Sequence, residues 1–342
     1  MKILVFADKV ACVGGVQTAQ KYIIQALNSV GVETTTNPND NYDLVDMQLF
    51  VGRAGKIAKY CKKHGIPFIM HGHSTSGDMT HSFRWWPLVM HLWFKPGVYN
   101  LYKKADLIIP VSHFCKDLIE PDIIYSGVPL KVVNNALDLK EFKKDNTKID
   151  AFEKYFNINK DDKVVINAAS IFERKGLPDF IEVAKRNPNV KFIWFGETKG
   201  FIWNPKMKKL IKHLPNNMIM PGQIRDDIFF GALQRANCVF YPSFVETDGY
   251  VALEAMASKT PLLVRDIGAL EWLEDGVHCY KGNNVEEFNE KLHLILENDN
   301  TKMTDTAYRK VKKERDLKVI GEQLKQVYQE ILNNKNKENE IK

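Results

Sequence analysis

Short apolar runs alternate with segments of helical periodicity along most of the chain. Continuous apolar runs of this kind, separated by helices, are typical of buried parallel strands in βαβ units. The alternation occurs in both halves, so the pattern predicts two doubly wound α/β domains, each with a parallel sheet. The expected strands are Ile3–Ala7, Leu44–Val51, Pro67–Met70, Leu107–Val111 and Val132–Val133, and then Val164–Ala168, Val190–Phe195, Met218–Met220, Cys238–Tyr241 and Leu262–Val264.

A polar and charged stretch, Lys143–Lys163, separates the two series of runs and predicts the domain boundary. We expect an N-terminal domain over residues 1–150 and a second domain over residues 151–315. An apolar stripe that includes Ile320 and Leu324 predicts a helix over residues 316–332. Residues 333–342 have little apolar content and are expected to form a disordered tail.

Composition and charge narrow the possible functions. The chain has 342 residues, of which 44% are hydrophobic and 26% charged, which supports two folded cores. Its net charge of +6 permits an anionic ligand or membrane surface but is too low to predict a nucleic-acid partner. Five scattered cysteines favour a reduced, cytoplasmic protein. The apolar start is too short for a signal peptide, and Trp85–Phe94 is too short to span a bilayer.

The most informative stretch begins at the expected strand Cys238–Tyr241. Pro242 ends that strand, and a helix is expected from Tyr250 to Ser258. The loop between them carries Glu246 at the carboxyl end of the strand, where ligands bind in open α/β sheets. The amides at the start of the helix suit an anion. An ordinary strand–loop–helix unit with a capping acid is an equal interpretation of the spacing alone.

Three other expected strand ends carry candidate residues. Gly14 and Gly15 allow a tight turn or a close approach to a ligand, without a dinucleotide fingerprint or P-loop. Arg174 and Lys175 lie beside a glycine before a helix, which suits a diphosphate but also fits an ordinary basic loop. The histidine pair that ends at His73 has no Cys, Asp or Glu partner at ligand spacing, so no metal site is predicted.

The helix expected near Arg53–His64 carries cations without acids. A single-sign face predicts contact with anionic lipid, although a merely exposed helix has the same pattern. Tryptophans beside cations in the next segment suit a membrane interface, and a buried aromatic core is the alternative. The candidate membrane-binding residues are Arg53, Lys56, Lys59, Lys62, Lys63, Trp85, Trp86 and Trp93.

Three segments resemble family 4 retaining glycosyltransferases of the GT-B fold: Phe172-Glu-Arg-Lys-Gly, Phe244-Val-Glu-Thr-Asp-Gly and Leu253-Glu-Ala-Met-Ala-Ser-Lys-Thr-Pro. Within that family they look most like the bacterial diacylglycerol glycosyltransferases. The resemblance covers nearly the whole chain. It implies two Rossmann-like, doubly wound domains facing across a cleft, with the helix over residues 316–332 crossing back to the first domain. The chain departs from the family pattern near Ser170, where an upstream arginine is missing, and at Ala269, which replaces a glycine.

The resemblance also implies roles for individual residues. His73 and Glu246 are the expected catalytic residues: His73 reaches the reactive sugar and Glu246 contacts the donor hexose. Glu254 contacts the nucleotide ribose, and Arg174 with Lys175 holds the diphosphate. The full set expected to bind the donor is Gly14, Gly15, Arg174, Lys175, Gly222, Ile224, Glu246, Thr247, Asp248, Gly249, Tyr250 and Glu254.

The implied activity is transfer of an α-linked glucose or galactose from a UDP-sugar to a lipid acceptor, with retention of configuration. The acceptor implied is a monoglycosyl-diacylglycerol. The resemblance implies no metal and no cofactor besides the UDP-sugar co-substrate. It places the protein in the cytoplasm, on the inner face of the cell membrane. Two alternatives remain open. The same core could serve a polysaccharide, an undecaprenyl-linked or another soluble acceptor, or the chain could be a non-catalytic nucleotide-sugar-binding subunit.

Overall fold

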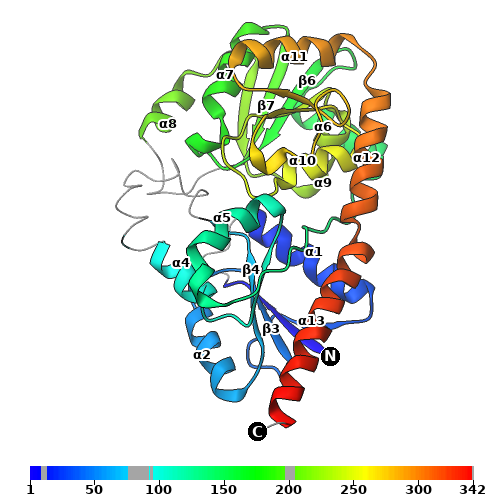
Figure 1. Ribbon diagram of the computed structural model, residues 1–342. Coiled ribbons are helices and arrows are strands. Elements are labelled where there is room, and N and C mark those ends of the chain that lie inside the picture. The colour runs from blue at the N-terminus through cyan, green and yellow to red at the C-terminus, as the bar shows by residue number, and fades with distance from the viewer. Residues whose placement is uncertain (9–13, 76–91, 93–94, 197–204, 341–342) are drawn as a thin grey trace. The chain divides into compact units, whose positions relative to one another are not determined.

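The computed structural model describes residues 1–8, 14–75, 92, 95–196 and 205–340 (Figure 1). The described residues before Leu139 and those from Lys313 onward form unit 1, and Leu139–Lys312 forms unit 2. The first boundary lies ahead of the expected position at residue 150. Helix α6 (Asn146–Phe156) belongs to unit 2 because it packs against α9 (Asp226–Arg235), where Gly231 lies directly on the backbone of α6.

Unit 1 is built on a five-stranded parallel sheet in the order β2-β1-β3-β4-β5. Its buried strands match the predicted apolar runs, but no strand forms at Val132–Val133. There the backbone follows β5 through single hydrogen bonds, such as Lys131 N to Ile108 O at 3.0 Å. The elements are β1 (Lys2–Phe6), α1 (Gly15–Ser29), β2 (Glu33–Thr35), β3 (Leu44–Met47), α2 (Ala54–His64), β4 (Phe68–Gly72), α4 (Lys95–Tyr102), β5 (Leu107–Pro110), α5 (His113–Ile123) and η3 (Ile124–Ser126).

Unit 2 is built on a six-stranded parallel sheet in the order β11-β10-β9-β6-β7-β8. Its core holds a cluster of aromatic rings in which Phe180 packs on Trp194 and Phe240. Besides α6 and α9, the elements are β6 (Lys163–Ala168), η4 (Glu173–Lys175), α7 (Leu177–Arg186), β7 (Val190–Phe195), α8 (Pro205–Leu210), η6 (Ile211–His213), β8 (Met218–Gly222), β9 (Cys238–Tyr241), α10 (Tyr250–Ala257), β10 (Leu262–Arg265), η7 (Gly268–Leu270), β11 (Tyr280–Gly282), α11 (Val285–Glu297) and most of α12 (Thr301–Arg315), which continues into unit 1 after Lys312.

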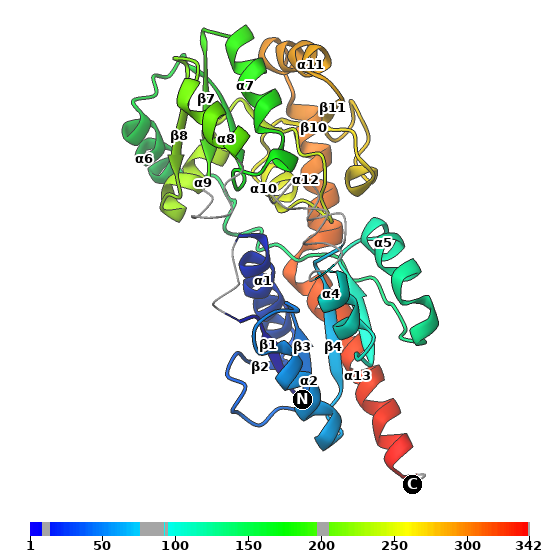
Figure 2. The ribbon, with the colours of Figure 1, turned by 90° about the vertical axis from the view of Figure 1, so that its left-hand side faces the viewer.

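The last helix, α13 (Leu317–Glu340), packs beside α1 in unit 1 (Figure 2). The two helices approach closely because Gly321 has no side chain: a Cβ atom there would lie 2.3 Å from the carbonyl oxygen of Ala26. Lys325 also donates from Nζ to the Val30 carbonyl at 3.0 Å. The helix continues to Glu340, where the sequence led us to expect a disordered tail from residue 333, and Lys335 lies 3.7 Å from an Asp106 carboxylate oxygen.

Candidate active site

Glu246 lies on the loop between β9 and α10, at the carboxyl end of the unit 2 sheet, and is only 8% exposed. Its Oε1 atom accepts hydrogen bonds from Lys175 Nζ and Ser243 Oγ, both at 2.5 Å. Burial raises the pKa of Glu246, but the charges of Lys175 and Arg174 and the hydrogen bonds from Lys175 and Ser243 together hold that pKa below its ordinary value. The carboxylate is therefore ionised at neutral pH.

Four of the predicted donor-binding residues of unit 2 lie around the Tyr241 side chain, namely Arg174, Lys175, Glu246 and Glu254. Lys175 Nζ lies 5.9 Å from the centroid of the Tyr241 ring. The pKa of Tyr241 is raised well above its ordinary value, first by burial and then by the charge of Glu246, with a smaller contribution from Glu254 and an opposing one from Arg174. Two acids and two bases that are distant in sequence thus share one neighbourhood.

Gly176 brings the cationic turn against the loop that follows β9. It adopts a φ of +78°, and a Cβ atom there would lie 2.2 Å from the Pro242 carbonyl oxygen, so only glycine fits. Across this contact Arg174 donates from Nη1 to the Val245 carbonyl at 3.0 Å, and the Phe244 amide donates to the Arg174 carbonyl at 2.7 Å. The guanidinium of Arg174 therefore fixes the loop that carries Glu246.

The remaining expected donor contacts occupy two places in unit 2. Gly249 adopts a φ of +83° at the start of α10. Ahead of it on the same loop, Asp248 is buried and Thr247 half-buried, and Tyr250 begins the helix. Gly222 ends β8 with a φ of +80°, and its carbonyl accepts from the Gly196 amide at 2.9 Å.

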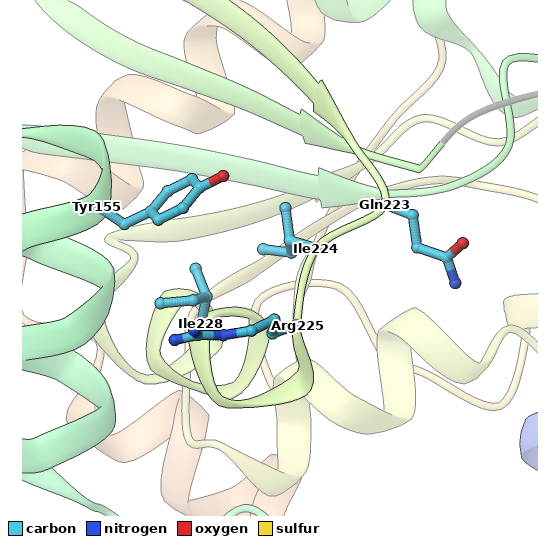
Figure 3. Close-up of a pocket in the computed structure, with 5 residues that line it drawn as sticks. All are labelled: Tyr155, Gln223, Ile224, Arg225 and Ile228. Carbon is cyan, nitrogen blue, oxygen red and sulfur yellow. The ribbon is translucent and has the colours of Figure 1, made fainter.

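Ile224 lies beyond β8 in a pocket of about 400 Å³ (Figure 3). In Figure 3 Tyr155 of α6 and Ile228 of α9 flank Ile224, while the Gln223 side chain points away from Tyr155. The described residues that line the pocket are Tyr155, Gln223, Ile224, Arg225 and Ile228, and neither Lys175 nor Glu246 is among them. This pocket is therefore separate from the charged cluster around Tyr241.

Arg265, which the sequence did not single out, supports the same loop from β10. Its guanidinium stacks 3.8 Å from the Phe244 ring centroid and donates from Nε to the Pro242 carbonyl at 3.1 Å. It also pairs with Asp179 of α7. Burial lowers the pKa of Arg265 below its ordinary value, against the opposing charge of Asp179. The only sequence signal was a cation at the end of an otherwise apolar strand.

In unit 1, His73 follows β4 and its side chain is held by two neighbours. Its Nε2 lies 2.8 Å from Gln48 Oε1, and its ring stacks on His71 with centroids 4.9 Å apart. Burial, and then the proximity of His71, lower the pKa of His73 well below 6.5. The imidazole is therefore neutral at pH 7, and a neutral ring bonded to an amide oxygen through Nε2 carries its proton on that nitrogen.

A buried carboxylate lies behind this histidine pair. Asp46 of β3 is fully buried, with Oδ1 3.0 Å from His71 Nδ1, and Tyr328 of α13 donates its hydroxyl to Oδ2 at 2.5 Å. Burial and the Asp46 charge raise the pKa of Tyr328 well above its ordinary value, so the phenol remains a donor. Sequence analysis missed Asp46, although an acid inside the apolar run Leu44–Val51 was a usable signal.

Gly14 and Gly15 lie at the start of α1, near the carboxyl end of β1. Gly14 adopts a φ of +66°, a conformation that favours glycine. An added Cβ atom at either position would meet none of the described atoms within 4 Å. The pair therefore serves a turn that does not depend on close packing with the described part of unit 1.

The exposed basic face of α2 does not contain all of the cations that the sequence predicted for it. Lys56, Lys59 and Lys63 share one exposed stripe with Tyr60, with Lys62 beside it, while Ala54, Ile57, Ala58 and Cys61 are buried on the opposite side. Arg53 does not belong to this face. It precedes the helix, and its Nε lies 3.3 Å from Asp8 Oδ2 at the end of β1.

The other candidate membrane residues, Trp85, Trp86 and Trp93, lie outside the described residues. Within the part of the chain that the structure describes, no helix is long and apolar enough to cross a membrane. Among the same residues, no group of three or more His, Cys, Asp or Glu side chains is arranged to hold a metal ion.

Two doubly wound units with parallel sheets, one carrying paired cations and acids at the carboxyl ends of its strands, define a GT-B glycosyltransferase. Solved structures confirm this fold. Sucrose-phosphate synthase from Thermosynechococcus elongatus superposes with a TM-score of 0.80 at 14% identity, covering 97% of this chain and 99% of that one. Anabaena HepE in complex with UDP and glucose gives a TM-score of 0.76 at 17% identity, covering 96% and 100%.

Sequence comparison identifies the family within this class. Residues 148–315 match the model of the glycosyl transferases group 1. The chain is 40% identical to the processive diacylglycerol alpha-glucosyltransferase of Acholeplasma laidlawii over 335 residues, 97% of this chain and 99% of that protein. It is 22% identical to the alpha-galactosylglucosyldiacylglycerol synthase of Streptococcus pneumoniae over about half of each chain. The chain therefore belongs to the group 1 glycosyltransferases and is an enzyme of that family.

Proposed function

We propose that the enzyme transfers an α-linked hexose from a UDP-sugar to a lipid acceptor, a monoglycosyl-diacylglycerol, with retention of configuration. The observation that carries the proposal is the charged cluster around Tyr241, in which Lys175 contacts Glu246. A cationic group and an ionised acid at the carboxyl end of a sheet are suited to a ligand that has both phosphates and hydroxyls. The A. laidlawii relative at 40% identity, a processive diacylglycerol alpha-glucosyltransferase, supports the lipid acceptor.

Within this proposal the donor binds to unit 2. Lys175 neutralises charge on the departing diphosphate, and charge-assisted hydrogen bonds of this type contribute roughly 1.5–3 kcal/mol each. Glu246 accepts hydrogen bonds from the hexose hydroxyls, for which its ionised state is required, and Glu254 accepts them from the ribose. Arg174 acts by holding the Glu246 loop through the Val245 carbonyl.

The chemical step we propose is a front-side displacement. The bond from the anomeric carbon to the UDP oxygen breaks, a bond to the acceptor oxygen forms on the same face, and the acceptor proton passes to the departing phosphate. No side chain is then an obligatory base, which agrees with the lowered pKa of His73, since a lower pKa makes the imidazole a weaker base. Positioning and electrostatics supply the acceleration, without a metal ion.

We also propose that the enzyme works on the cytoplasmic face of the membrane as a peripheral protein. The exposed lysines of α2 support this, because no described carboxylate lies within 4 Å of Lys56, Lys59, Lys62 or Lys63. Each cation close to an anionic surface contributes roughly 1 kcal/mol, so four give about 4 kcal/mol, which is reversible attachment.

A panel of UDP-sugars offered with monoglucosyl-diacylglycerol tests the transfer reaction. We expect one UDP-hexose to give a diglycosyl lipid with an α-linkage, in the presence of a chelator as well as without it. Product mass and anomeric configuration are the readouts. Release of no UDP from any UDP-hexose would favour a non-catalytic subunit, and transfer only to soluble saccharides would favour the polysaccharide alternative.

Flotation with vesicles tests the membrane contact separately. The triple variant Lys56→Gln, Lys59→Gln, Lys63→Gln is expected to lose binding to phosphatidylglycerol vesicles, by roughly 3 kcal/mol or about 100-fold in affinity at low salt. Exchange of the ion-paired Lys116, Lys131 and Lys191 for glutamine is the matched control, because it removes the same formal charge from outside α2. Equal loss in both variants would contradict a specific role for α2.

A further inference from the structure

The carboxyl end of the unit 1 sheet carries an ion pair that neither the proposed donor site nor the α2 lysines use. Asp8 follows β1, and its Oδ2 accepts from the backbone amide of Arg53 at 3.1 Å and from the Arg53 Nε at 3.3 Å. The Arg53 side chain is 54% exposed, while that of Asp8 is only 10% exposed. The buried carboxylate therefore holds an arginine whose outer edge faces solvent.

The local backbone is shaped to hold this pair. Gly52 adopts a φ of +66°, and a Cβ atom there would lie 2.6 Å from Asp8 Oδ2. Any larger residue would displace the carboxylate. The Arg53 guanidinium also lies 5.0 Å from the centroid of the Phe6 ring, an arrangement that fixes the plane of the group. No described residue accepts a hydrogen bond from Nη1 or Nη2 of Arg53, and the side chain is 54% exposed, so these donors are accessible to a ligand.

A continuous line of contacts connects this pair to His73. The strands β1, β3 and β4 are neighbours in the sheet, so their carboxyl ends lie side by side. The backbone N–H of Gln48, just after β3, donates to the carbonyl of Phe6 at 2.8 Å, and Phe6 lies two residues before Asp8. The Gln48 side chain lies 2.8 Å from His73. Asp8, Arg53, Gln48 and His73 therefore form one row along the sheet edge.

The charge of the pair indicates what kind of ligand suits it. A carboxylate and a guanidinium in contact have no net charge, and the nearly buried Asp8 holds the donors of the exposed Arg53 in a fixed position. That combination suits the hydroxyl groups of an uncharged polyol. A phosphate group would meet the Asp8 carboxylate, which repels it, whereas the lysines of α2 lack such a neighbour.

We infer that Arg53, held in place by Asp8, binds the hydroxyl groups of the acceptor's hexose headgroup, and that the neutral pair selects a glycosylated lipid over an anionic one. This inference rests on the proposed function, since it names the part of the acceptor that this sheet edge receives. It assigns Arg53 to substrate recognition and leaves attachment to the membrane surface to the lysines of α2.

Transfer from UDP-glucose or UDP-galactose to monoglucosyl-diacylglycerol in uncharged detergent micelles tests the inference, because no anionic surface is present. Arg53→Gln is expected to raise the apparent KM for the glycolipid about tenfold, the effect of losing one or two hydrogen bonds to a hydroxyl. The KM for the UDP-sugar is expected to stay at the wild-type value. Flotation of this variant on phosphatidylglycerol vesicles is expected to match the wild type.

Asp8→Asn distinguishes the two headgroup chemistries. It leaves the guanidinium without its neutralising partner, so it is expected to weaken binding of the hexose headgroup and to strengthen binding to phosphatidylglycerol. A lower apparent KM for the glycolipid in Asp8→Asn than in the wild type would overturn the inference. The matched control is Lys2→Gln, which breaks the ion pair with Glu33 at the opposite end of β1 and is expected to leave the acceptor KM unchanged.

The outcomes distinguish the proposed function from the role of the Asp8–Arg53 pair. A wild-type enzyme that transfers no hexose to the glycolipid would overturn the proposed function itself. A wild-type enzyme that is active, with Arg53→Gln unaltered in acceptor KM at an unchanged melting temperature, would overturn only the role of the Asp8–Arg53 pair. Loss of vesicle flotation in Arg53→Gln would instead return Arg53 to the membrane-binding set.

Discussion

Individual side chains in this enzyme have their charge states set by their immediate neighbours. Glu246 is buried but stays ionised because neighbouring cations and hydrogen bonds together outweigh the cost of burial. Burial and the proximity of His71 keep His73 neutral, and its partners among the described residues are Gln48 and His71. At the residue scale, the candidate site thus combines a fixed negative charge in unit 2 with an uncharged imidazole in unit 1.

Glu246→Gln removes that fixed charge while keeping the shape of the side chain. We expect hexosyl transfer to fall at least ~100-fold, comparable to the loss of one preorganised electrostatic contact in a transition state, as measured by UDP release. Lys175 would also lose its ion-pair partner. Glu182→Gln, which alters an exposed acid of α7 paired with Lys185, is the control, and an equal loss there would contradict a local role for Glu246.

His73 makes stability depend on pH. Its pKa in the unfolded chain is near 6.5 and in the folded protein well below that value. Below about pH 6.5 the unfolded chain therefore binds more protons, and the free energy of unfolding falls as the pH drops, by at most about 1.4 kcal/mol per pH unit. His73→Gln is expected to flatten this slope in melting curves recorded from pH 7 to 5. An unchanged slope would show that His73 titrates normally.

At the scale of elements, the site depends on turns that bring distant loops into contact. The predicted strands and the two parallel sheets follow from apolar runs, which is why they could be derived from the sequence. The ion pair of Lys175 with Glu246 joins residues 71 apart, and no local pattern encodes that contact. The strand β11 (Tyr280–Gly282) was missed because three residues with one large apolar side chain give no periodicity.

Gly176→Ala tests the contact between the cationic turn and the β9–α10 loop. The added Cβ atom would lie 2.2 Å from the Pro242 carbonyl oxygen, so we expect a loss of several kcal/mol in stability and a fall in activity as Lys175 moves. Gly31→Ala has a similar φ of +75° but meets no described atom within 4 Å. It is expected to show only the backbone strain, about 1 kcal/mol, in denaturant unfolding curves.

On the scale of the whole molecule, the chain builds two units with separate cores, and it returns to the first through α13. Sequence analysis predicted both sheets and a final helix, but not that Tyr328 would reach Asp46, 282 residues away. The predicted helix also ended too early, at residue 332. The sparse apolar content after that point gave no sign that Lys335 would contact Asp106. Contacts of such separation become visible only once the fold is known.

Tyr328→Phe leaves the buried Asp46 carboxylate without its hydroxyl donor. We expect a loss of about 1–3 kcal/mol, seen in calorimetry as a lower melting temperature for the transition of unit 1. Because the cores are separate, Gly176→Ala should shift the transition of unit 2 instead. If both variants shifted one common transition, the two units would unfold as a single cooperative body.

The return of α13 to unit 1 has a consequence for biosynthesis. Ribosomes deliver the chain in order, so β1, β3 and β4 emerge long before Gly321 and Tyr328 exist. Unit 2 can complete its own core during translation, whereas the domain made first must wait, its α1 face uncovered and Asp46 lacking one of its partners. The nascent N-terminal sheet is thus the part of this enzyme that most needs protection from aggregation, for example by a chaperone. It is also the part that completes its folding last.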